Sequence, residues 1–336
     1  MMSDMYDATV VGGGPAGMFA AFYCGLNKLK VQLIEALPQF GGQLTALYPE
    51  KKIWDVAGLP GVKSADLVKK LEDQLQLVPV DKFTGEKVTD VVKEDDGTFK
   101  IVSGNRVSHS KAVIIALGNG AFKARPLALP GADEMTGKQI RYFVRHKEEF
   151  AGKRVAVLGG GNSALDNAQM LAPVAKEVDV IHRRDNFRGH KLVVDELRST
   201  ENVNLITPYL PREITLNGDG SVQLTLRKMH SNDEEQTLTV DYIIVNYGFT
   251  ANNAALRDWS LDLASERNQL TVNTSMATNI SGVYAIGDGV HYEGRTPLIA
   301  TGFGEAPIAA TAITKLLYPE RTVSGHSSSL DLKKPN

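Results

Sequence analysis

The chain has 336 residues, and its 37 Lys and Arg almost balance its 39 Asp and Glu, so its charge predicts binding neither to nucleic acid nor to an anionic membrane. Hydrophobic residues make up 43% of the chain, and this length and composition predict two domains or one large one. The single cysteine excludes an internal disulfide framework, a CxxC redox pair and a cysteine zinc cage. The first residues lack the pattern of a secretion signal, and no apolar run approaches the roughly 20 residues of a membrane span, so we expect a cytoplasmic protein.

A glycine motif comes first in the chain, within residues 6–24. A β-branched run leads into Gly12, Gly14 and Gly17, and an Ala-rich segment follows, which matches G-x-G-x-x-G between a predicted strand and a predicted helix. The first glycine allows a tight turn, the second lets the backbone approach a pyrophosphate, and the third lets helix and strand pack. The helix N-terminus offers N–H groups and a positive dipole end to phosphates. We therefore assign this turn, with Ala16, to a dinucleotide.

Two strand patterns follow the first motif. Residues 87–104 alternate around an acidic turn, which predicts a pair of antiparallel strands. Residues 111–120 form an apolar run that ends in glycines, which is typical of a buried parallel strand.

Residues 153–171 repeat the first motif. A β-branched run again leads into Gly159 and Gly161, and Ala164 stands where the third glycine would be. Asn162 and Ser163 open the predicted helix and are assigned to the same site. Two ordinary strand–helix turns are the alternative interpretation, but two copies in the correct context favour two dinucleotide sites.

The two copies differ at the end of the second strand, where a Rossmann unit places an acid that binds a ribose hydroxyl. Glu35 fills this position in the first unit, whereas the same spacing from the second motif lands on His182, followed by Arg183 and Arg184. A guanidinium group suits a 2′-phosphate, which an acid would repel. The first site is therefore predicted to bind FAD or NAD and the second NADP. A solvated turn is the alternative for the arginines.

The second half of the chain completes an α/β pattern. Residues 203–229 alternate and contain an Asn-Gly-Asp-Gly turn, which predicts antiparallel strands, and 241–249 read as another buried parallel strand. Residues 282–290 form a strand that ends at Gly287-Asp288, where Asp288 is placed to accept hydrogen bonds from sugar or ribitol hydroxyls. Residues 296–318 predict a helix packed on the sheet. The fold class is thus two Rossmann-like, three-layer ββα domains, each with a parallel sheet and an antiparallel insertion.

These motifs together resemble the two-dinucleotide flavoprotein family that includes thioredoxin reductase. The resemblance covers nearly the whole chain. It implies a discontinuous FAD-binding domain, residues 1–120 and 250–336, with an NADPH-binding domain, residues 121–249, inserted in it. Because two domains carry the two cofactors, we expect a rotation of the domains, with the segments 119–122 and 247–250 as hinges.

The resemblance carries site residues with it. It implies that the segment with Gly42 and Gln43 lies along the FAD, and that Asp288 holds its ribitol or pyrophosphate. It implies that the motif HRR…R, here His182, Arg183, Arg184 and Arg188, binds the 2′-phosphate of NADPH.

Thioredoxin reductases carry a CxxC dithiol just before the second glycine motif, and this chain has none there. Without it, electrons cannot leave the flavin by disulfide exchange.

The chain is most similar to the ferredoxin–NADP reductases of thioredoxin-reductase type, which are homodimers. In these, Tyr48 would stack on one face of the isoalloxazine and the partner subunit's His326 would cover the other. Ser328 would lie near the flavin, and Val88 and Phe122 would touch the adenine and the flavin region.

The function that follows is hydride transfer between NADPH and FAD, then single-electron transfer to or from a ferredoxin or a flavodoxin. The cofactor does the redox chemistry, so no side chain is assigned as catalytic acid, base or nucleophile, and no metal is expected. Two alternatives stay open. One is an NADPH-dependent flavin diaphorase or oxidase, and the other is a nucleotide-sensing binding module.

Overall fold

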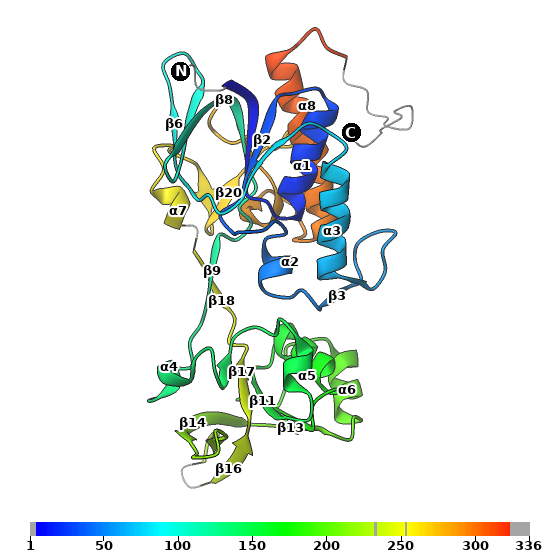
Figure 1. The fold of residues 1–336 in the computed structure, drawn as a ribbon, viewed down its shortest axis with the longest axis vertical. Helices are drawn as coiled ribbons and strands as arrows, with labels where there is room; N and C mark the ends of the chain where they lie inside the picture. Colours follow the sequence, from blue (N-terminus) through cyan, green and yellow to red (C-terminus); the bar gives the residue numbers. More distant parts are fainter. Residues whose placement is uncertain (1–4, 232–233, 253, 323–336) are drawn as a thin grey trace. The chain divides into compact units, whose positions relative to one another are not determined.

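The computed structural model describes residues 5–231, 234–252 and 254–322. The chain folds into two compact units, shown in Figure 1. Unit 1 combines Met1–Ala121 with Ala251–Asn336, and unit 2 is Phe122–Thr250. The two connections between them contain β9 (Ala121–Ala124) and β18 (Phe249–Asn252), which pair with each other.

The main sheet of unit 1 is built on β1 (Met5–Val11), whose residues after Met5 are all buried. A strand buried on both faces is typical of the interior of a parallel sheet. The strand order is β5 (Asp81–Phe83), β2 (Val31–Ile34), β1, β8 (Arg106–Ile115), β7 (Phe99–Ser103) and β6 (Val88–Lys93), with β21 (Val283–Ala285) also beside β8. The strands β5, β2, β1, β8 and β21 are parallel, whereas β6 and β7 form an antiparallel extension.

Helices of unit 1 cover this sheet. The helix α1 (Pro15–Leu26) packs against α8 (Ile299–Leu317) and α3 (Ser64–Leu75). Small residues of α8, such as Ala306, Ala309 and Ala310, are fully buried and allow close packing. The remaining elements of this unit are α2 (Gln43–Ala46), β3 (Lys52–Ile53), β4 (Val62–Lys63), α7 (Ala254–Arg257), β19 (Ser265–Glu266), β20 (Gln269–Thr271), η2 (Gly287–Gly289) and β22 (Val290–His291).

Unit 2 contains a second parallel sheet. Its order is β13 (Val203–Ile206), β12 (Glu177–Ile181), β11 (Arg154–Leu158), β17 (Tyr242–Val245) and β10 (Ile140–Arg141). The helices α5 (Asn162–Leu171) and α6 (Lys191–Arg198) pack together, and β14 (Tyr209–Leu216), β15 (Val222–Lys228) and β16 (Glu235–Val240) form a separate antiparallel sheet. Two short elements, α4 (Ala132–Met135) and η1 (Lys147–Phe150), precede β11.

The internal repeat extends to the whole topology. The parallel order β5-β2-β1-β8-β21 in unit 1 corresponds strand by strand to β13-β12-β11-β17-β10 in unit 2. In each unit the chain adds antiparallel strands between the first and the fourth strand of that order, which are β5 and β8 in unit 1 and β13 and β17 in unit 2. The predicted fold class of two Rossmann-like domains is therefore confirmed. The prediction that residues 203–229 form only antiparallel strands is wrong. Their first strand is β13, which pairs with β12 in parallel and so extends the parallel sheet of unit 2.

Candidate functional site

In the glycine turn after β1, two glycines are closely packed and the third has open space around it. A Cβ at Gly12 would collide with the carbonyl of Ala116, and a Cβ at Gly17 would collide with the carbonyl of Gly12, so both positions need glycine for packing. Around Gly14, in contrast, no atom lies within 4 Å of where a Cβ would be. Gly14 is the N-cap of α1, and neither a capping side chain nor an acidic residue occupies the first turn. The open backbone and uncapped N–H groups fit a pyrophosphate.

Three other segments of unit 1 meet this turn at the carboxyl ends of the parallel strands. Gly41 donates its N–H to the carbonyl of Gly13 at 2.8 Å, and a Cβ at Gly42 would lie 3.2 Å from the Cα of Gly14. The segment that begins α2 with Gln43 is thereby held beside the glycine turn. Because β1, β2, β8 and β21 are parallel, their carboxyl ends lie along one edge of the sheet, where α/β proteins bind ligands.

Glu35 follows β2 directly and turns its carboxylate toward the glycine turn. The carboxylate accepts the N–H of Gly13 at 2.6 Å and that of Leu37 at 2.8 Å, and the residue is 7% exposed. Burial raises the pKa of this carboxyl group, and the hydrogen bonds from Leu37 and Gly13 act in the opposite direction. Glu35 therefore contacts the glycine turn of the site to which it was assigned.

Asp288 belongs to η2, which follows β21 at the same sheet edge. Its main-chain carbonyl accepts the side-chain amide of Gln269 at 2.9 Å, and its carboxylate remains 39% exposed. A Cβ at Gly287 would lie 3.4 Å from the Cβ of Ala16, so the turn packs on the first turn of α1. The structure thus brings Gly14, Ala16 and Asp288 together in unit 1.

The glycine turn of unit 2 has the same construction. Gly159 approaches the carbonyl of Asn246 so closely that a Cβ would lie 2.6 Å from that oxygen, whereas around Gly161 no atom lies within 4 Å of a Cβ position. Gly161 is the N-cap of α5 without a capping side chain, and Asn162 and Ser163 form the first turn. Asn162 also accepts the N–H of His190 at 3.1 Å through its side chain. This turn too fits a pyrophosphate.

His182 follows β12 directly, in the position that Glu35 holds after β2. Its ring fills the space where a Cβ of Gly160 would be and lies tilted against the Phe187 ring, with 5.4 Å between the ring centres. The residue is 7% exposed. Burial lowers the pKa of His182, and the positive charges of Arg188, Arg183 and Arg184 lower it further. The imidazole is therefore neutral at pH 7, and it fixes the turn that carries the arginines.

The three arginines surround this neutral ring. Arg183, Arg184 and Arg188 are exposed, and none of them forms an ion pair with another described residue. Arg188 donates its main-chain N–H to the carbonyl of Gly160 at 2.7 Å. A cationic cluster is therefore anchored to the second glycine turn, with its guanidinium groups available to an anion.

The family model of the pyridine nucleotide-disulphide oxidoreductases matches residues 6–311. The chain belongs to this family. The resemblance inferred from the glycine motifs and the HRR…R motif is confirmed, and so is the assignment of the chain to the oxidoreductases.

Relatives within the family cover the chain almost completely. A ferredoxin–NADP reductase of Limosilactobacillus fermentum is 60% identical over 331 residues, which cover 98% of this chain and 100% of that protein. Ferredoxin–NADP reductase 2 of Bacillus subtilis is 46% identical, over 97% of each chain. Among solved structures, the thioredoxin reductase of Lactococcus lactis has a TM-score of 0.79 at 26% identity, covering 94% of this chain and 99% of that one. That of T. acidophilum also has a TM-score of 0.79.

The one cysteine of this family member cannot act as half of a dithiol. Cys24 is fully buried in α1, and burial raises the pKa of its thiol to about 12. A buried, protonated thiol is not a nucleophile. Among the described residues there is also no group of three or more His, Cys, Asp and Glu that could hold a metal ion, and no helix long and apolar enough to span a membrane.

Of the remaining predicted site residues, the structure describes the side chains of Tyr48 and Val88 only. Tyr48 is half-buried just after α2, with the Lys51 ammonium 5.7 Å from the centre of its ring. The side chain of Val88 is 6% exposed and packs in the core of unit 1. Phe122 lies in β9, but its side chain is outside what the structure describes, and His326 and Ser328 lie outside the described residues altogether.

Sequence reasoning missed two charged residues beside Asp288. Arg295 and Glu305 form an ion pair in which both side chains are almost fully buried. The only signal was a glutamate in the apolar run of α8, and a helix pattern alone does not reveal its partner.

Proposed function

We propose that this chain is an FAD-dependent ferredoxin–NADP reductase, in which unit 1 binds FAD and unit 2 binds NADPH. The observation that carries the proposal is the difference between the two equivalent glycine turns. An acid, Glu35, follows the second strand of one, and His182 with Arg183 and Arg184 follows that of the other. The names of the relatives, which match over nearly the full length of the chain, support the same activity.

The residues of each turn have distinct roles in this proposal. In unit 1, Gly12, Gly14, Ala16 and Gly17 form the turn whose N–H groups bind the pyrophosphate, while Glu35 accepts a hydrogen bond from the adenosine ribose. In unit 2, the corresponding turn is formed by Gly159, Gly161, Asn162 and Ser163, and Arg183, Arg184 and Arg188 bind the 2′-phosphate. His182 holds the arginine segment without adding a charge of its own. When bound, FAD supplies the redox chemistry by accepting a hydride and releasing electrons singly.

Other residues complete the FAD site of the proposal. Gly42, Gln43 and Asp288 lie along the cofactor, and Tyr48 covers one face of its isoalloxazine. His326 and Ser328 are proposed to cover the other face from a partner subunit, and Val88 and Phe122 are proposed to contact the cofactor more peripherally. No side chain is needed as a general acid or base.

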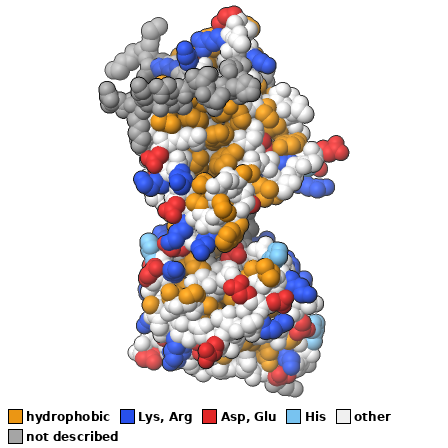
Figure 2. Space-filling view, turned by 90° about the vertical axis from the view of Figure 1, so that its right-hand side faces the viewer, with side chains coloured by type: hydrophobic (Ala, Val, Ile, Leu, Met, Phe, Trp, Pro, Cys, Tyr) orange, Lys and Arg blue, Asp and Glu red, His pale blue; other side chains and the backbone are white. Residues whose placement is uncertain are grey.

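The proposed partners are a ferredoxin or a flavodoxin, and a second copy of this chain. Figure 2 shows hydrophobic side chains gathered on the side of unit 1 that carries α1, α3 and α8. On α8, Ile308 is 43% exposed and Leu316 is 49% exposed. An apolar surface of this kind supports association between two copies.

Loading the protein with FAD tests whether it is an enzyme or a binding module. The FAD-loaded protein should be yellow and should lose its flavin absorbance under nitrogen when NADPH is added, and much more slowly with NADH. A protein that does not take up FAD, or whose flavin stays oxidised in NADPH, contradicts the proposal.

The choice of acceptor separates a reductase from a diaphorase or oxidase. With NADPH as the donor, electrons should pass to ferredoxin or flavodoxin faster than to oxygen or a quinone at equal concentration. Faster reduction of oxygen or quinone than of both carriers would replace the reductase by the diaphorase.

A further inference from the structure

A buried ion pair lies beneath the turn that carries Asp288. The Nε of Arg295 is 2.8 Å from Oε1 of Glu305, and the two side chains are 4% and 2% exposed. Arg295 lies in the loop before α8, and Glu305 lies within α8. Two charges buried this deeply are costly unless further hydrogen bonds satisfy them, so the remaining partners of the pair are informative.

Glu305 accepts hydrogen bonds from three sides. Besides Arg295, the Tyr292 hydroxyl donates to its Oε1 at 3.0 Å, and the main-chain N–H of Gly287 donates to its Oε2 at 2.6 Å. Gly287 has a φ of +77°, a left-handed conformation that favours glycine. Glu305 thus holds, through a charge-assisted bond, the residue that immediately precedes Asp288.

One nitrogen of Arg295 forms no hydrogen bond, although it lies within ion-pair distance of Asp288. Its Nη2 is buried and makes no hydrogen bond, and the Oδ1 of Asp288 lies 3.6 Å away, beyond hydrogen-bond distance. A buried donor without an acceptor is destabilising, and native structures rarely keep one unless a ligand or water satisfies it. The orphaned nitrogen lies beside the carboxylate that is proposed to hold the ribitol or pyrophosphate of FAD.

We propose that Arg295 is an FAD-binding residue and that Glu305 is its positioning residue. Arg295 donates through Nη2 to an oxygen of the FAD portion that Asp288 holds. Glu305 acts through two contacts, one that orients the guanidinium and one that fixes the Gly287-Asp288 turn. This inference rests on the proposed FAD site of unit 1 and adds to it two residues that no glycine motif contains.

The test measures the dissociation constant of FAD by titrating the apoprotein, at a temperature well below its unfolding. Arg295→Lys keeps the charge and removes the guanidinium fork, and Glu305→Gln keeps the shape of the side chain and removes its charge. Each should weaken FAD binding about 10-fold or more, because a hydrogen bond to a charged group is lost or misplaced. Glu305→Gln should also shift the visible absorption and circular dichroism of the bound flavin.

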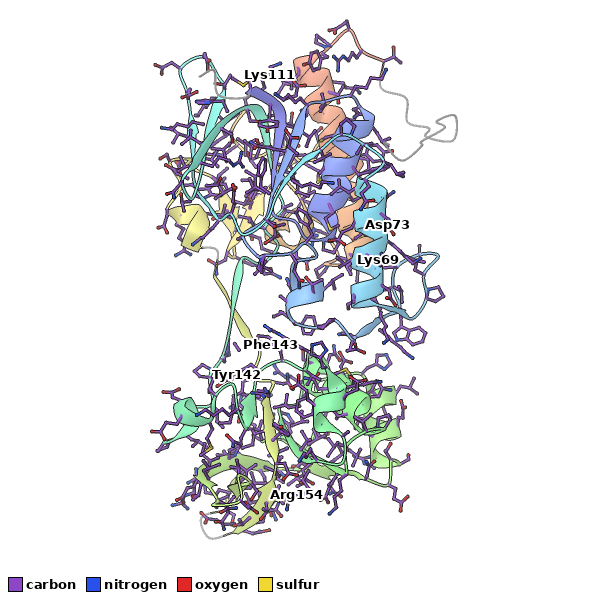
Figure 3. The ribbon with its side chains drawn as sticks, in the orientation of Figure 1. Lys69, Asp73, Lys111, Tyr142, Phe143 and Arg154 are labelled. Atoms are coloured by element: carbon purple, nitrogen blue, oxygen red, sulfur yellow. The ribbon has the colours of Figure 1, made fainter. Side chains whose placement is uncertain are left out.

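A matched control separates this role from a purely structural one. Arg154, labelled in Figure 3, forms an ion pair of similar length with Asp241 in unit 2, with 2.9 Å between Nη2 and Oδ1. Arg154→Met should lower the melting temperature without changing the FAD affinity. If Arg295→Lys and Glu305→Gln behave in the same way, the pair only stabilises unit 1 and the inference is wrong.

Two further outcomes complete the test. If both variants fail to fold, Tyr292→Phe, which removes only the hydroxyl that donates to Glu305, should still weaken FAD binding measurably and shift the flavin spectrum. An unchanged affinity and spectrum in that variant would overturn the inference. If the wild-type protein itself does not bind FAD, the proposed function fails first, and this result is distinct from a failure of the variants.

Discussion

Glu35 and His182 occupy equivalent positions and have opposite electrostatic surroundings. Glu35 follows β2, His182 follows the corresponding strand β12, and each contacts the glycine turn of its unit. Glu35 receives main-chain N–H groups, whereas His182 lies among arginines. Counting residues from the glycine motif was enough to predict this correspondence, because the spacing from Gly12 to Glu35 equals that from Gly159 to His182. The hydrogen bonds of Glu35 and the burial of His182 required the structure.

Coenzyme preference is expected to reside in two side chains. Replacing Arg183 and Arg184 with Ala should raise the KM for NADPH about 10- to 100-fold for each arginine, since a charged hydrogen bond to the 2′-phosphate is lost. The KM for NADH should change little, because NADH has no such phosphate. Arg198→Ala, at an exposed arginine of α6, is the matched control. An equal loss for both coenzymes would mean that the arginines only form a solvated turn.

The neutral state of His182 predicts a pH dependence of stability. Its pKa is lowered from 6.5 in the folded protein, so below about pH 6.5 the unfolded chain binds the proton more readily. The free energy of unfolding should therefore fall as the pH drops from that value toward the lower, folded pKa. In His182→Asn this part of the pH dependence of the melting temperature should vanish, whereas it should persist in His190→Gln. Parallel curves for the wild type and His182→Asn would show that His182 does not titrate in this way.

At the scale of elements, the glycines in the turn between β1 and α1 have different roles: Gly12 is needed for packing, and Gly14 leaves room for the cofactor. Gly14→Ala should leave the melting temperature of the apoprotein nearly unchanged, because open space surrounds the new methyl group and the backbone φ of −70° suits any residue. The same methyl group would stand where the pyrophosphate binds, so the dissociation constant of FAD should rise about 10-fold or more. Gly12→Ala is the contrasting variant, and it should destabilise the fold itself. Normal FAD affinity in Gly14→Ala would show that the cofactor does not lie on this turn.

The elements also show where prediction from sequence ends. Apolar runs and glycine punctuation predicted β1, β11, α1 and α5, because each pattern is local. The strand β13 was assigned to an antiparallel group, since a four-residue run does not reveal its neighbour in the sheet. Arg295 and Glu305 were missed for a similar reason: only the packing of α8 brings them to Gly287.

For the whole molecule, the absence of a dithiol determines how electrons can leave. The solved structures with TM-scores of 0.79 are thioredoxin reductases, but Cys24 is the only cysteine of this chain and is fully buried. The fold is therefore shared while the exit of electrons differs, so function had to be inferred from the sites and not from the fold. The relatives named ferredoxin–NADP reductases match this chain over nearly its full length.

Electron transfer from NADPH to a ferredoxin is the activity proposed for this chain. The most direct measurement is steady-state reduction of ferredoxin under nitrogen by the FAD-loaded protein, with NADPH and NADH compared and free FAD as the blank. Ferredoxin reduction should be rapid with NADPH, and kcat/KM should be much smaller with NADH. A rate no greater than that of free FAD, with ferredoxin and with flavodoxin alike, would contradict it.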